Sequence, residues 1–173
     1  GKRAIEKAYE EADKFVGRAL RESDSRTTLI VMSDHGFAPF YRSFSLNTWL
    51  QQRGYFDPLD RAKSQAYGVG FNSLYLNLEG REKEGLVKAE QVDELLETLR
   101  EELLAQKDPK TGQPVFKAVY RSTEIYHGAE RGKAPDLVLG YHRGYRGSWK
   151  SALGQTEEKV LTDNLEVWSG DHL

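Results

Sequence analysis

The chain has 173 residues, of which 38% are hydrophobic and 30% charged, and its formal net charge is −2. This length and apolar content suit a single domain or a large part of one. The small net charge gives no reason to expect binding to a nucleic-acid polymer or an acidic membrane. Because the chain has no cysteine, disulfides, thiolate zinc sites and cysteine nucleophiles are excluded, and any metal must be bound through nitrogen and oxygen.

The ends of the sequence lack targeting features. No stretch is apolar for long enough to span a bilayer, and the N-terminus has no signal-peptide pattern, so we expect a cytoplasmic protein without a membrane segment. The sequence starts directly in a helical pattern and stops one residue after His172. We therefore expect it to be a truncated part of something larger.

The first elements follow an α/β order. Residues 2–22 carry apolar side chains at helical spacing and predict an amphipathic helix. Residues 27–32 form a short apolar run of β-prone residues, which predicts a buried strand. A polar and aromatic stretch, residues 37–44, comes next. Ser45 is placed to cap a short helix that Gly54 would end.

The later elements alternate between strands and helices. Residues 74–78 alternate leucine with polar or aromatic side chains, which predicts a half-buried strand. Residues 88–105 place their leucines on one face and predict a helix with a solvated charged face. A turn is predicted at 108–112, and strands are predicted at 115–120 and 137–139. The order predicts the α/β class, with helices packed on a mostly parallel sheet.

The tetrapeptide Ser33-Asp34-His35-Gly36 directly follows the predicted strand 27–32. In open α/β sheets, ligand sites gather at the carboxyl ends of strands. A second pair, Asp171-His172, follows Gly170, and two carboxylate–imidazole pairs suggest a metal centre. The alternative for the first pair is a surface loop with a capping aspartate and a partly buried histidine. Ser33 is rejected as a nucleophile, because three consecutive residues can hardly form the hydrogen-bonded line of a catalytic triad.

Residues 141–149 alternate aromatic and arginine side chains. Arg143 and Arg146 could bind substrate by donating hydrogen bonds to a phosphate oxygen, while the aromatic side chains stack on a substrate ring. The alternative, which we favour slightly, is an exposed loop whose aromatic side chains pack on the body of the domain. His127, at the end of a short turn near Ser122, is better explained by an interaction with a helix dipole than by catalysis.

Four segments together resemble the alkaline phosphatase superfamily, and their residues are 33–37, 75–82, 134–141 and 169–172. The closest likeness is to the type I phosphodiesterase / nucleotide pyrophosphatase branch, including prokaryotic proteins described as predicted phosphohydrolases or phosphomutases. The resemblance implies part of a three-layer fold with an α+β excursion. It also implies hydrolysis of a small phosphate ester by two divalent ions, usually zinc, with manganese also admitted by the ligand types.

The resemblance assigns metal ligands residue by residue. Asp34 and His35 match the pair that binds the ion beside the nucleophile, and His172 matches a late histidine that binds the other ion. Asp171 is not carried over as a ligand, although it could orient the imidazole of His172. The family also has an early aspartate, a serine or threonine nucleophile and an Asp-x-x-x-His pair, all before the Asp-His-Gly segment, and this chain has no counterpart of them.

These departures shape the prediction for the whole chain. We expect the C-terminal half of a metal-dependent phosphohydrolase, with core segments 1–36 and 134–173 and an inserted excursion at 37–133. With three of its ligands and no nucleophile, the chain itself is expected to bind metal weakly and to be inactive. A non-catalytic binding or interaction module on the same scaffold is the alternative. The oligomeric state stays open.

Overall fold

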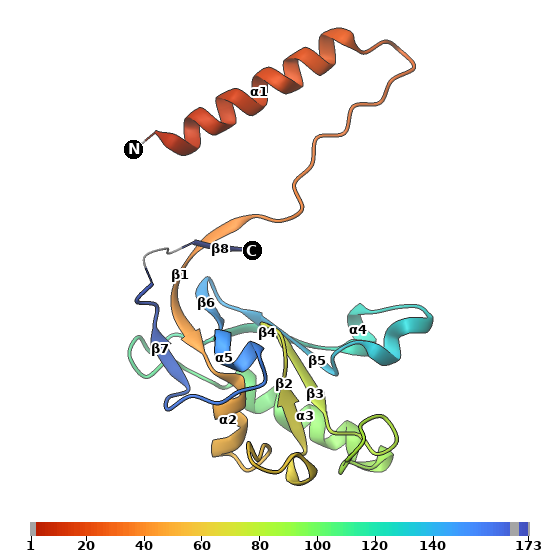
Figure 1. Cartoon of the computed structure of the whole chain (residues 1–173), viewed down its shortest axis with the longest axis vertical. Helices are drawn as coiled ribbons and strands as arrows, with labels where there is room; N and C mark the ends of the chain where they lie inside the picture. Colours follow the sequence, from red (N-terminus) through yellow and green to blue (C-terminus); the bar gives the residue numbers. More distant parts are fainter. Residues whose placement is uncertain (1–2, 167–169, 173) are drawn as a thin grey trace. The chain divides into compact units, whose positions relative to one another are not determined.

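The computed structural model describes residues 3–166 and 170–172, and the side chains of residues 171 and 172 lie outside the description. The chain divides into two compact units, Gly1–Gly36 and Phe37–His172. Among the described residues, no helix combines the length and the apolar composition that crossing a membrane requires. Figure 1 shows the elements of each unit.

The first unit contains one helix, α1 (Ala4–Glu22), which confirms the predicted amphipathic helix. Its apolar face is not covered, since none of its residues is buried. The predicted strand at 27–32 is wrong: this segment is extended but forms no strand, and Ile30, Val31 and Met32 are 74%, 68% and 81% exposed. A strand requires a neighbour to satisfy its backbone hydrogen bonds, and no described residue pairs with this segment.

The first sheet of the second unit is built around β1 (Phe37–Phe44). Its partner β6 (Gly144–Gly147) runs parallel to it, while β7 (Leu161–Asp163) and β8 (Gly170–His172) run antiparallel. Strands from the beginning and the end of this unit therefore lie side by side, as Figure 1 shows.

The second sheet has the strand order β2-β3-β5-β4 and is antiparallel throughout. Its strands are β2 (Ala66–Gly68), β3 (Ser73–Leu76), β4 (Phe116–Arg121) and β5 (Leu137–Tyr141). The α/β class is confirmed, but the predicted mostly parallel sheet is wrong for the described strands, because among the pairings of named strands only β1–β6 is parallel. Short connections such as the one between β2 and β3 allow only antiparallel pairing, because a parallel pair needs a long crossover.

Two helices supply much of the core of the second unit. Leu96, Leu99 and Leu103 of α3 (Val92–Leu104) are buried, and Trp49 and Leu50 of α2 (Leu46–Gln52) are fully buried. They pack with residues of both sheets in one hydrophobic cluster. The remaining elements are the short helices α4 (Ser122–Ile125) and α5 (Trp149–Ala152) and the 3-10 turns η1 (Arg61–Lys63), η2 (Ala89–Gln91) and η3 (Ala129–Lys133).

Most predicted elements of the second unit are confirmed, but five of its strands were not predicted, namely β1, β2, β6, β7 and β8. The polar and aromatic stretch 37–44 is β1, and the loop predicted at 141–149 contains β6. In β1 the even-numbered residues are buried, but one of them is Arg42, which hides the apolar alternation. The chain divides at 36/37, where the excursion was expected to begin, yet residues 134–172 pack with 37–133. That 1–36 and 134–173 share one core stays a prediction.

Candidate functional site

Asp34 and His35 turn their side chains toward each other. The carboxylate Oδ2 of Asp34 lies 3.3 Å from Nε2 of His35, and the backbone N–H of His35 donates to Oδ1 of Asp34 over 3.1 Å. The Ser33 hydroxyl donates to the carbonyl of His35 over 2.7 Å, which bends the backbone at this point. In a regular strand the two side chains would point to opposite faces, so this bend allows both to approach one ligand.

Both ring nitrogens of His35 have close neighbours. Nδ1 of His35 lies 3.1 Å from the carbonyl oxygen of Gly36. A carbonyl oxygen only accepts, so this contact favours a proton on Nδ1, and Nε2 then faces Oδ2 of Asp34. In the neutral imidazole Nε2 carries a lone pair, so a cation between it and the carboxylate would bring together two acceptors at this separation. The Asp34 side chain is exposed and that of His35 about one-third exposed, so solutes can reach the pair.

His172 lies in the second unit. Its backbone belongs to β8 and is paired with Phe37 in the register of β1. Its side chain and that of Asp171 lie outside the description, so their predicted roles stay predictions. Among the side chains that are described, no three histidine, aspartate or glutamate residues are grouped as a metal site would require.

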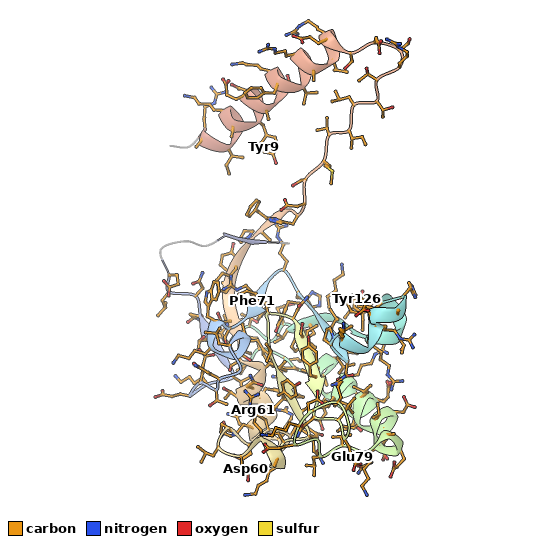
Figure 2. All side chains as sticks on the ribbon, turned by 45° about the vertical axis from the view of Figure 1, so that its right-hand side comes forward. Tyr9, Asp60, Arg61, Phe71, Glu79 and Tyr126 are labelled. Atoms are coloured by element: carbon orange, nitrogen blue, oxygen red, sulfur yellow. The ribbon has the colours of Figure 1, made fainter. Side chains whose placement is uncertain are left out.

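The two arginines predicted to bind substrate have different surroundings. Arg143 is exposed. Arg146 is buried in β6, and its guanidinium carbon lies 4.5, 4.7 and 4.8 Å from the ring centres of Phe40, Phe71 and Trp149. Figure 2 labels Phe71, which is one wall of this cage. Cation–π contacts of this kind stabilise the fold and fix the guanidinium, and the predicted substrate role of both residues stays a prediction.

An ion network around Arg42 could not be predicted from the sequence. Arg42 of β1 donates from Nε and Nη2 to both oxygens of Asp108, at 2.8 Å each, and from Nη1 to Asp163 over 2.8 Å. Asp108 is fully buried and also accepts from the Lys110 backbone and the Tyr145 hydroxyl. Donation from Arg42 lowers the pKa of Asp108 to about 2. The turn signal at 108–112 identified Asp108 only as a turn residue, because nothing in the sequence links it to Arg42.

A second ion pair joins two of the segments that carry the family resemblance. Arg81 donates from Nη1 and Nη2 to the two carboxylate oxygens of Asp136, at 3.0 and 2.7 Å, and from Nη2 to the carbonyl of Leu76. Asp136 also accepts from the backbone N–H of Leu76 in β3. This pair ties the end of β3 to the start of β5. Its role is therefore to hold the second sheet together.

The comparisons with known proteins agree with the resemblance. The family model described as type I phosphodiesterase / nucleotide pyrophosphatase matches residues 1–162. No curated protein and no solved structure matches the chain. The α/β structure is consistent with an alkaline-phosphatase-like fold. The match covers most of both units, and the chain belongs to the type I phosphodiesterase / nucleotide pyrophosphatase family, whose members are hydrolases of phosphoric esters within the alkaline phosphatase superfamily.

Proposed function

We propose that this chain supplies part of a two-metal site in a phosphodiesterase or phosphatase. Asp34 and His35 would bind one divalent ion and His172 the second, with zinc as the first choice and manganese as the other. The nucleophile and the remaining ligands would come from a part of the protein that these 173 residues do not include. When bound, the ions would polarise the ester and stabilise charge on the phosphoryl oxygens.

The observation that carries the proposal is the separation of 3.3 Å between Oδ2 of Asp34 and Nε2 of His35. Two zinc ligands with bonds of about 2.0–2.1 Å in tetrahedral geometry lie ~3.3–3.4 Å apart, so the pair is spaced as two ligands of one ion. The Gly36 carbonyl at Nδ1 supports this, because ligating histidines usually donate their other ring N–H to such an acceptor.

Two ligands fall short of a complete site. A catalytic zinc ion usually has three protein ligands, and Asp34 and His35 supply two donors from adjacent residues. The serines and threonines before residue 34 are not accompanied by a histidine, since the first histidine of the chain is His35. We therefore expect this chain alone to bind zinc weakly and not to hydrolyse phosphate esters.

The test uses the longer protein that contains this chain, with two readouts: metal content by mass spectrometry and hydrolysis of bis(p-nitrophenyl) phosphate. We expect Asp34→Ala and His35→Ala each to reduce bound metal and to slow hydrolysis by a factor of at least about 100. His127→Ala is the matched control, because His127 is exposed and outside the proposed site. Unchanged metal content and rate in the first two variants would refute the ligand assignment.

The same measurements distinguish the enzyme from the alternative, a non-catalytic binding module. A protein that binds metal through Asp34 and His35 but fails to hydrolyse a panel of phosphate monoesters and diesters would support a binding module. Hydrolysis that disappears together with the metal supports the enzyme. The sequence upstream of these residues gives an independent check, because the enzyme requires a serine or threonine nucleophile and an Asp-x-x-x-His pair there.

A further inference from the structure

A groove on the second unit lies between the start of α3, the β4–α4 junction and η3, and we call it the α3–η3 groove. Its volume is ≈ 330 Å³ and its apolar lining includes Leu78, Val92 and Leu96. Its polar lining residues include Arg121, Ser122 and Arg131. The carboxylates Asp93 and Asp136 also line it, paired with Arg121 and Arg81 respectively. Tyr126, labelled in Figure 2, directly follows α4. This volume is within the range of sites that hold small molecules.

The arginines of the groove differ in how far they are neutralised. Arg81 is held by Asp136, Glu82 and a backbone carbonyl. Arg121 uses Nη2 on Asp93 at 2.6 Å, and no described residue accepts from its Nε or Nη1. The side chain of Arg131 has no hydrogen-bond or ion-pair partner among the described residues, although it lines the groove. Two guanidinium groups therefore keep donors for a ligand.

Hydroxyl groups and apolar surface complete the lining. The side chains of Ser122 and Thr123 line the groove, and within the described part of the chain neither donates to a protein acceptor. Both could donate to an oxyanion held by the guanidinium groups. Leu96 is buried beneath the groove, while Leu78 and Val92 are half-buried, so apolar surface remains for the rest of a ligand.

We propose that the α3–η3 groove binds a small organic anion that joins a phosphate or carboxylate group to an apolar moiety. Arg131 and Arg121 would bind the oxyanion, with the hydroxyls of Ser122 and Thr123 beside them, and the apolar moiety would cover Leu78 and Val92. Charge-assisted bonds to guanidinium are about twice as strong as neutral ones, so the arginines carry most of the affinity. This proposal does not rest on the proposed metal ligands Asp34 and His35.

The test titrates phenyl phosphate, benzoate and benzyl alcohol separately into the ¹⁵N-labelled chain and follows the amide resonances of Ser122, Thr123 and Gly132. We expect saturable shifts with at least one of the two anions and none with the alcohol. The two anions separate a phosphate from a carboxylate ligand. Raising sodium chloride from 50 to 500 mM should weaken binding, since exposed ion pairs are screened by salt.

The variant Arg131→Gln should weaken binding by about tenfold, as expected for the loss of a charged donor. Lys133→Gln is the matched control: it removes the same charge from the same turn, but Lys133 is paired with Glu130 and does not line the groove. It should change the affinity by less than about twofold. Equal weakening in both variants, or shifts that never saturate with either anion, would overturn the proposal. Asp34→Ala should leave this binding unchanged, which keeps the outcome separate from that of the metal site.

Discussion

The two units of this chain differ in whether they bury their apolar side chains. In the second unit Phe44 is fully buried and packs edge-to-face on Phe116, with ring centres 5.0 Å apart. In the first unit Phe15 lies on the apolar face of α1 and is 73% exposed. Phe15 belongs to a clear helical pattern, whereas Arg42 hides the strand alternation around Phe44. The difference shows that a pattern predicts which face of an element is apolar, while burial also requires a partner.

The same difference explains the segment 27–32. Its sequence is that of a buried strand, yet its apolar side chains are exposed in the structure. The strand β1, whose sequence is far less apolar, is paired on both sides. Strand formation is thus decided by which segments are available for backbone pairing, because β propensity depends strongly on context.

The largest expected effect comes from truncating the same residue type in the two units. Phe44→Ala removes a fully buried ring and should lower the free energy of unfolding of the second unit by about 3–5 kcal/mol. Phe15→Ala should change it by less than about 0.5 kcal/mol, because its side chain is already exposed. Urea denaturation followed by tryptophan fluorescence measures both. A similar loss in the two variants would show that α1 packs in solution on a surface that matters for stability.

The buried ion pair gives the next largest effect. Asp108→Asn removes the fully buried partner of Arg42 and leaves it with the partly exposed Asp163, and breaking a buried ion pair costs about 3 kcal/mol. Asp93→Asn is the matched control, because it neutralises an exposed carboxylate paired with Arg121 and should cost less than about 1 kcal/mol. The same denaturation experiment compares them. If the two losses are equal, burial is not what makes the Arg42–Asp108 pair important.

Lowering the pH protonates Asp108 and should weaken its ion pair with Arg42 reversibly, with a smaller effect on stability than the substitution. The Arg42 guanidinium holds the pKa of Asp108 at about 2, below its ordinary value of 3.8. A carboxyl whose folded pKa is lowered stabilises the fold fully above its unfolded pKa and loses this contribution as the pH falls through its folded pKa. Between about pH 4 and pH 2, we expect a loss of about 2 kcal/mol. Thermal unfolding across this range should show a steeper decline in the parent chain than in Asp108→Asn.

The sequence predicted the elements whose signals are local. Leu99 and Leu103 lie on the predicted face of α3, and Leu74 and Leu76 point into the core from β3, because helix and strand periods determine those faces directly. The strand β1 was missed because its buried Arg42 is neutralised by Asp108, which lies 66 residues away. A pairing over that distance leaves no periodic signal.

The candidate site could likewise be predicted only where its residues are neighbours in the sequence. Asp34 and His35 were identified from a local motif, and the structure brings their side chains together. Arg81 and Asp136 lie in segments that carry the family resemblance, but their bidentate pairing across 55 residues emerges only from the fold. The α3–η3 groove likewise combines Val92 with Arg131, which are brought together by tertiary packing.

The strand β1 also has a consequence for how the chain is made. Its partners in β6, β7 and β8 are separated from it by on the order of 100 residues or more along the sequence. At ribosomal rates of about 5–20 residues per second, roughly 10 s pass between the synthesis of β1 and that of its last partner strand. During that time its Phe40 and Phe44 are without their final packing. Nascent chains of this protein should therefore depend on chaperones until the C-terminal strands emerge.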